Sequence, residues 1–195
     1  MTRGASPAMM NCTTVQDAGP PIWCGRVAAT RRKRNVDEAP TMSLESVRAF
    51  LAANAPDVPI IELETSSATM TLSAAWSIEP AQIAKTLSVR AGDRNVLLVT
   101  CGNARVDNKK AKAALGGKVR MLRPEEAAAI TGHPVGGVCP FGLATPLPIY
   151  CDVALRAFEE VVPAAGSTHA AIRINPIRLA ELVDAEWIDV CEHQR

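Results

Sequence analysis

The sequence predicts an α/β fold, a single domain with a mixed, mainly antiparallel sheet surrounded by helices. At 195 residues and 48% hydrophobic content, the chain is long enough for one ordinary core. Segments with helical spacing of apolar residues are intermixed with short apolar runs typical of strands. Hairpin signals are more frequent than clean strand–helix–strand repeats, which favours antiparallel pairing.

Residues 1 to about 41 predict a disordered extension ahead of a folded domain over 42–195. They carry Gly, Pro, Ser and Thr and a basic run, Arg31-Arg32-Lys33-Arg34, without sustained apolar periodicity. Three interpretations compete: a flexible basic arm for RNA, a targeting peptide, and an upstream start codon followed by residues that matter little. The last is favoured, because Met42 opens a well-formed element and the tail lacks an apolar signal core.

Helical spacing and capping residues define the predicted helices. These helices cover 43–55, 69–76, a short turn from Pro80, 108–115, 124–131, a turn through 158, and 177–183. Ser43, Asp107 and Asn175 are the expected N-caps, because their side chains can accept from free backbone N–H groups. Gly116 and Gly132 are the expected stops.

Short apolar runs bounded by turn residues define the predicted strands. These strands cover 59–64, 86–89, 96–100, 119–122, 147–151, 161–164, 169–174 and 187–190. Turns at 92–95 and 165–168 predict two hairpins. The strand over 96–100 is apolar on both faces and is expected at the centre of the sheet. Prolines in the strand over 147–151 suggest an edge or a bend.

Charge and cysteine usage exclude several classes of protein. A formal net charge of +1 provides no global attraction to nucleic acid or membrane, so a basic site must be local. The apolar runs fall short of a membrane-spanning helix. Six cysteines without a Cys-x-x-Cys pair, and three histidines far apart, give neither a disulfide framework nor a metal centre. We expect a cytoplasmic protein without membrane association or a metal centre.

The segment Gly136-Gly137-Val138-Cys139-Pro140-Phe141-Gly142 is the clearest candidate for a site. Three glycines and a proline in seven residues exclude a helix or a central strand, so the segment is a loop inside the folded domain. It is either a tight structural turn or a loop that lets a ligand approach bare backbone N–H groups.

Four segments in register resemble one family. They are Gln82-Ile83-Ala84-Lys85-Thr86-Leu87, the Lys-rich helix after Asp107, the glycine loop Gly136–Gly142, and Ala165-Gly166-Ser167 ahead of Ile174-Asn175-Pro176. Together they are similar to the YbaK/prolyl-tRNA deacylase family, akin to the editing domain inserted in bacterial prolyl-tRNA synthetases. The resemblance spans about 42–191. One departure is Trp76-Ser77-Ile78, where the family pattern has a leucine-glycine-valine turn.

The resemblance implies a free-standing hydrolase that cuts the ester between a wrong amino acid and the 3′-terminal ribose of a tRNA. It also implies a barrel-like mixed sheet, no cofactor, and tRNA as partner, with prolyl-tRNA synthetase as a second possible partner. The lysine that matches Lys85 is the most important side chain in such proteins. The loop that matches Gly136–Gly142 walls the amino-acid pocket, and Gly166 and Ser167 complete the substrate-binding set.

These residue types suit ester hydrolysis. An aminoacyl ester is already activated, so a positioned water and donors for the developing oxyanion suffice. N–H groups near Gly136 and Gly137 can supply such donors. Lys85 can hold the terminal phosphate or a ribose oxygen; without the family resemblance it would be an ordinary surface lysine.

Cys139 could be a nucleophile assisted by His133 or His169, but no third orienting residue is evident. We therefore expect Cys139, with Val138 and Phe141, to line the pocket and select the amino acid by size. Ser167 either bonds the substrate amine or closes its hairpin.

Lys109, Lys110 and Lys112 place at least two ammonium groups on one helix face. This face either meets the acceptor stem of the tRNA or is merely solvated. The favoured function is trans-editing of tRNA for proline that carries cysteine, alanine or another small amino acid. A paralogue that binds tRNA or an amino-acid-like ligand with little turnover is the alternative, and a hydrolase dependent on Cys139 is a third hypothesis.

Overall fold

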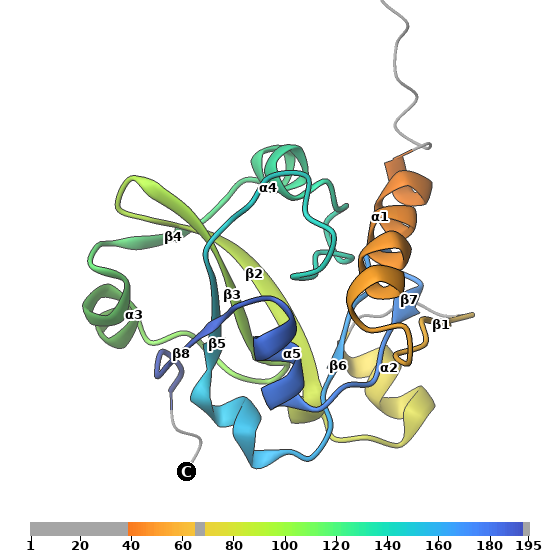
Figure 1. Ribbon diagram of the computed structural model, residues 1–195. Helices are drawn as coiled ribbons and strands as arrows, with labels where there is room; N and C mark the ends of the chain where they lie inside the picture. Colours follow the sequence, from red (N-terminus) through yellow and green to blue (C-terminus); the bar gives the residue numbers. More distant parts are fainter. Residues whose placement is uncertain (1–38, 65–68, 193–195) are drawn as a thin grey trace, which may run out of the picture. The chain divides into compact units, whose positions relative to one another are not determined.

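The protein is described by a computed structural model over residues 39–64 and 69–192 (Figure 1). Residues 1–38 of the extension predicted for residues 1 to about 41 lie outside the described part of the chain. Helix α1 runs from Ala39 to Asn54, so the expectation that Ser43 caps it is wrong. The helix begins earlier because Pro40 falls in its first turn, where a proline is tolerated, although the apolar spacing starts only at Leu44.

The predicted hairpin of the longest strands forms the middle of the main sheet. Strands β2 (Ile83–Ala91) and β3 (Arg94–Cys101) pair antiparallel, with Leu87 opposite Leu98. The sheet has the order β4-β2-β3-β5-β8, and β6 also pairs with β2. The shorter strands are β4 (Val119–Met121), β5 (Ile149–Asp152), β6 (Val162–Pro163) and β8 (Glu186–Ile188).

This sheet is open, so the expected barrel-like closure is wrong. Strands β4 and β8 lie at opposite ends of the strand order and do not pair with each other. Each has only three residues, too few to provide the staggered ladder that closes a barrel.

The sheet is mixed, as predicted, and its longest ladder, β2–β3, is antiparallel. Strand pairs β2–β6, β3–β5 and β5–β8 are parallel, whereas β2–β3 and β2–β4 are antiparallel. The chain between β3 and β5 contains two helices, β4 and the glycine loop, which makes it long enough for a parallel crossover.

Strand β5 is interior, which contradicts the edge position that its prolines suggested. It pairs with β3 on one side and β8 on the other, and its four residues are buried. Pro148 is tolerated because it precedes the strand and contributes only its carbonyl, which accepts from Leu97 N at 2.9 Å.

Helices surround this sheet, as predicted. Besides α1 they are α2 (Thr69–Trp76), α3 (Asn108–Leu115), α4 (Pro124–Thr131) and α5 (Pro176–Leu182), with 3₁₀ turns η2 (Pro80–Gln82) and η3 (Val153–Ala157). Asp107 accepts from the N–H groups of Lys109 and Lys110, and Asn175 caps α5 in the same way. Gly116 and Gly132 end their helices in the left-handed conformation. These four predictions are confirmed.

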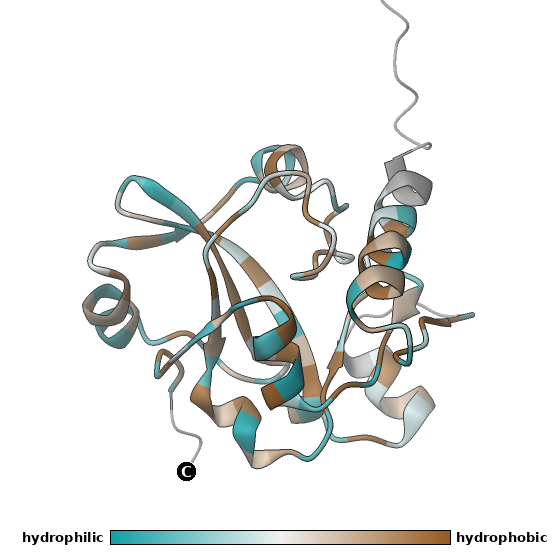
Figure 2. Ribbon diagram, viewed as in Figure 1, coloured by the Kyte–Doolittle hydropathy of each residue, from teal (hydrophilic) through white to brown (hydrophobic). Residues whose placement is uncertain are grey.

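The second predicted hairpin is also present. Val161 and Ile174 exchange two backbone hydrogen bonds, of 2.9 and 3.1 Å, across the turn at 165–168. Beyond it, β7 (Ala170–Ala171) pairs with β1 (Ile61–Glu62) in a separate two-stranded sheet. Figure 2 shows the most hydrophobic segments along the central strands, where Val96, Leu97 and Val99 are fully buried.

Candidate functional site

A cavity of about 420 Å³ opens along the edge of β2. Its size is typical of small-ligand sites. It is lined by Leu72, residues 83–88, Met121, Leu122, Pro124, Ala127, Val135, Gly136, Val138, Val162 and Ala164. None of these described residues is acidic, and most are apolar. The cavity therefore suits a neutral or anionic ligand with few polar groups.

Main-chain groups of β2 form part of this cavity because two partner strands leave a gap. Strand β6 pairs with residues 83 and 84, and β4 pairs with residues 89 to 91. Leu122 N donates to Ser88 O at 2.9 Å, so Ser88 directs its main-chain groups to the β4 edge. Thr86 has the same parity as Ser88, so its N–H and C=O also point to this edge. No described strand pairs with Thr86 there.

Lys85 lies within β2 rather than at its start, because the strand begins at Ile83, three residues before the predicted Thr86. Its Nζ donates to Ala104 O at 2.5 Å and to Gly102 O at 3.2 Å. An ammonium carries three N–H donors, so one remains for a ligand. Residue 85 lines the cavity at β2, whereas Ala104, Cys101 and Cys191, which surround its ammonium, line a second cavity of about 480 Å³.

Burial lowers the pKa of the Lys85 ammonium, because desolvation disfavours its charge. Thiolates at Cys191 and Cys101 would oppose this effect. Burial raises their own pKa values to about 12 and about 11, so both are neutral thiols near pH 7. Lys85 is therefore a cation without a charged partner among the groups that influence its pKa.

The first part of the glycine loop meets the same cavity. Gly136 and Val138 line it opposite β2. Gly137 is buried between them, and a Cβ there would lie 2.8 Å from backbone atoms of Ser167. Glycine is therefore required at 137 for the loop to lie against the turn of the second hairpin.

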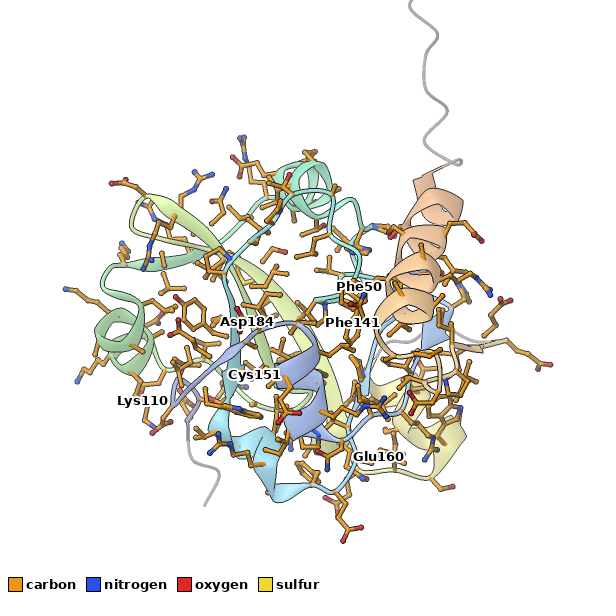
Figure 3. The ribbon with its side chains drawn as sticks, viewed as in Figure 1. Phe50, Lys110, Phe141, Cys151, Glu160 and Asp184 are labelled. Atoms are coloured by element: carbon orange, nitrogen blue, oxygen red, sulfur yellow. The ribbon has the colours of Figure 1, made fainter. Side chains whose placement is uncertain are left out.

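The rest of the loop leaves the cavity. Cys139 and Phe141 are fully buried, and Phe141 packs on Phe50 of α1 with ring centroids 5.9 Å apart (Figure 3). Pro140 and Gly142 line another hollow, of about 390 Å³, beside the end of α5. The structure thus brings Gly136 and Val138 to Lys85, but not the four residues from 139 to 142.

Cys139 is poorly suited to act as a nucleophile. Burial raises the pKa of its thiol to about 12, although backbone hydrogen bonds with Phe141 and Gly166 lower it in part. His133 Nε2 lies 3.9 Å from the sulfur and is 2.9 Å from Phe141 O. The imidazole is therefore engaged with the backbone, not with the thiol.

The second hairpin turn supports the loop without lining the cavity. Gly166 is buried against α1, where a Cβ would lie 2.6 Å from Ser43 O. Ser167 Oγ accepts from His169 N at 3.1 Å, which is the bond that closes a serine turn. Of the two roles considered for Ser167, the structure displays the closing of its hairpin.

The three lysines of α3 lie away from the cavity at β2. Lys110 Nζ donates to the Asp189 carboxylate at 2.8 Å and to Cys191 O at 2.9 Å. Asp189 and Cys191 line a different cavity, of about 480 Å³. Lys109 and Lys112 are exposed. Figure 1 shows α3 and α1 on opposite sides of the β2–β3 hairpin.

Sequence reasoning missed a basic surface on β4. Arg120 is directly opposite Arg90 in the ladder, and the next residue, Met121, lines the cavity. Like charges directly opposite destabilise a strand pair, so this arrangement favours an anion as partner. Arg90 also contacts Glu126 and Asn95. Only the pairing register reveals this surface, because the two arginines are thirty positions apart in the sequence.

The described residues contain neither a metal-binding cluster nor a membrane-spanning helix. The described residues contain no group of three or more His, Cys, Asp and Glu side chains that could hold a metal ion. Within the same part of the chain, no helix is long and apolar enough to span a bilayer.

Comparison with known proteins identifies the family. Residues 64–182, more than half of the chain, match the aminoacyl-tRNA editing domain family. The chain belongs to this family, and its resemblance to YbaK-like proteins is confirmed. The open mixed sheet and the cavity at β2 are therefore the fold and candidate site of an editing domain.

Particular relatives are similar over different lengths. The protein named only as uncharacterized protein YwhH of Bacillus subtilis (strain 168) is 45% identical over 154 residues, which cover 77% of this chain and 98% of YwhH. A proline–tRNA ligase of Bacillus licheniformis is 33% identical over 92 residues, 47% of this chain and 16% of the ligase. A crystal structure of a proposed trans-editing enzyme for prolyl-tRNA synthetase has a TM-score of 0.73 and 32% identity, covering 77% of this chain and 98% of that chain.

Proposed function

We propose that this protein is a trans-editing aminoacyl-tRNA deacylase. Its substrate is tRNA for proline that carries cysteine, alanine or another small amino acid. One observation carries the proposal: Lys85, Gly136 and Val138, from distant segments, line one cavity beside the open edge of β2. Membership of the editing-domain family and similarity to a proline–tRNA ligase support the same chemistry.

The ester lies between the open edge of β2 and Gly136 in this proposal. Thr86 N–H is the candidate donor for the oxyanion that forms when water attacks the carbonyl, because Gly137 N–H already donates to Pro134 O at 2.9 Å. Preorganised donors of this kind stabilise a tetrahedral intermediate because they need no rearrangement. Glycine at 136 allows the carbonyl to approach, since no side chain intervenes.

Lys85 has the role of an anchor. The third N–H of its ammonium donates to a ribose oxygen or to the terminal phosphate, while Gly102 O and Ala104 O hold the other two. Burial leaves the Lys85 ammonium incompletely solvated, which lowers its pKa. An added hydrogen-bond acceptor from the substrate is therefore favourable.

Two surfaces are candidates for the rest of the acceptor stem. Arg90 and Arg120 lie on β2 and β4, the strands that carry the cavity residues Ser88 and Met121, whereas Lys109 and Lys112 lie on α3. We place the stem on the arginine pair, because an RNA whose end fills the cavity passes over its rim.

The test is deacylation of tRNA for proline charged with proline, alanine, cysteine and 2-aminobutyrate. We expect the wild-type protein to remove one or more non-cognate amino acids and to spare proline. Lys85→Met, which keeps the length of the stem, should lower kcat/KM by about 10²–10³-fold, whereas Lys85→Arg should retain more activity.

Absence of cleavage above the spontaneous rate would overturn the hydrolase for this panel. Retained tRNA binding in that case would indicate the binding paralogue. Cys139→Ala serves as a further control, because its loss of activity with intact tRNA binding would restore a role for the thiol.

A further inference from the structure

The rim of the cavity holds the most exposed large apolar side chains in the described part of the chain. Met121 on β4 is 61% exposed, and Val135, just before the glycine loop, is 59% exposed. Both line the cavity at β2. Only one other large apolar residue among those described is exposed, Ile177 on α5, and it lies outside the cavity.

Single exposed apolar residues are common and need no explanation, but two at one cavity rim form a surface that a ligand can cover. Leu122 and Ala127, which are buried, and Pro124 also line the cavity. The rim is thus part of a largely apolar lining.

We infer that Met121 and Val135 form a binding site for the nucleobase of the 3′-terminal nucleoside of the substrate. The inference rests on the proposed function and specifies how that site binds the terminal nucleoside, whose ribose oxygen is the leaving group. The ester and the base are attached to the same ribose, so a base must lie close to the cavity whenever the ester lies between β2 and Gly136.

The side chains at the rim fit a base better than they fit a charged or strongly polar group. A methionine thioether makes favourable contacts with aromatic rings, and Val135 offers a compact apolar surface. Every base has an apolar face that can lie on such groups. The cavity lining has no carboxylate among its described residues, so a phosphate that adjoins the base meets no repulsion there.

The experiment compares two forms of tRNA for proline: one with its normal terminal adenosine and one in which the terminal nucleoside is an abasic ribose. Dissociation constants of the uncharged RNAs are measured for the wild-type protein, Met121→Ala, Val135→Ala and the double variant. We expect the wild-type protein to bind the normal end about tenfold more tightly, and the double variant to lose this preference. Ile177→Ala is the matched control and should keep it.

Equal binding of both RNAs by the wild-type protein would overturn the inference, as would an unchanged preference in the double variant. Both side chains are more than half exposed, so their truncation leaves the core intact; circular dichroism verifies the fold of each variant. Deacylation of the charged tRNA is assayed in parallel. Cleavage without any preference for the terminal base would refute the nucleobase site alone, whereas no cleavage of any charged tRNA would refute the proposed hydrolase.

Discussion

Ser43 and His133, ninety positions apart in the sequence, are joined by a 2.5 Å hydrogen bond between Ser43 Oγ and His133 Nδ1. On the other side of the ring, Nε2 lies 2.9 Å from Phe141 O. A carbonyl can only accept, so Nε2 carries the hydrogen and Nδ1 accepts from the serine hydroxyl. The neutral imidazole therefore ties α1 to the end of the glycine loop.

This arrangement predicts a loss of stability in acid. Burial lowers the pKa of His133, although its bond to Phe141 O opposes the effect. The unfolded chain, with an ordinary histidine pKa of about 6.5, then binds a proton more readily than the folded chain does. Stability due to the neutral ring is complete above about pH 6.5 and falls as the pH decreases toward the folded-state pKa.

Urea unfolding between pH 8 and pH 5 measures this effect. His133→Gln, which keeps an acceptor and a donor but does not titrate, should flatten the decrease. An equally steep decrease in this variant would assign the acid sensitivity to other groups.

Ser43→Ala removes the donor to His133 and leaves a buried ring nitrogen without a partner. We expect a decrease of about 1–3 kcal/mol in the free energy of unfolding. Ser46→Ala is the control one turn along α1: Ser46 Oγ donates only to Ser43 O, whose backbone remains hydrogen-bonded in the helix. Ser46→Ala should lower the free energy of unfolding by less than Ser43→Ala does. Equal decreases in the two variants would argue against a special role of the imidazole.

Gly137→Ala tests the contact between the glycine loop and the second hairpin. The new Cβ would lie 2.8 Å from backbone atoms of Ser167, which cannot move without shifting the turn. We expect a loss of about 1–3 kcal/mol in stability and a lower deacylation rate, because Gly136 and Val138 flank this position. In Gly92→Ala the Cβ meets nothing within 4 Å, and only the strain of φ +59° remains. That variant should retain its activity; full activity in Gly137→Ala would exclude the loop geometry as a requirement.

Arg120→Ala should weaken RNA binding and reduce its salt dependence. Losing about one phosphate contact lowers the slope of log K against log salt by about 0.7–0.9. The side chain is exposed, so the fold should tolerate the change. Lys109→Ala and Lys112→Ala provide the comparison from α3. If the salt slope decreased in the lysine variants and stayed unchanged in Arg120→Ala, the acceptor stem would bind at α3 and not at the arginine pair.

Ser77→Gly should raise the free energy of unfolding by up to about 1 kcal/mol. Ser77 follows α2 with φ +53°, a left-handed conformation that a glycine adopts without steric cost. Glycine is also the residue expected in this turn from the family resemblance. Thermal unfolding measures the gain, and Ser77→Ala should be no more stable than the natural chain. A destabilised Ser77→Gly would show that the hydroxyl outweighs the strain.

Local chemistry made much of the fold readable from the sequence. Asp107, Asn175, Gly116 and Gly132 bound their helices as predicted, because capping depends on a side chain and the backbone beside it. The β2–β3 hairpin followed for the same reason. Ser43 was misjudged as a cap because α1 begins at Ala39, and its hydroxyl bonds instead to His133, a distant partner that a local rule cannot detect.

The sequence by itself determined the family and the segments that carry the candidate site, since Lys85 and the glycine loop stand in recognisable motifs. Tertiary structure alone decided which of these residues share a cavity. It directed Val138 to the cavity and Cys139 to the core, left the edge of β2 open at Thr86, and brought Met121 and Val135 to one rim. The physical reason is that strand register and strand length, which depend on packing across the whole sheet, set where a main-chain edge stays unpaired and which side chains face it.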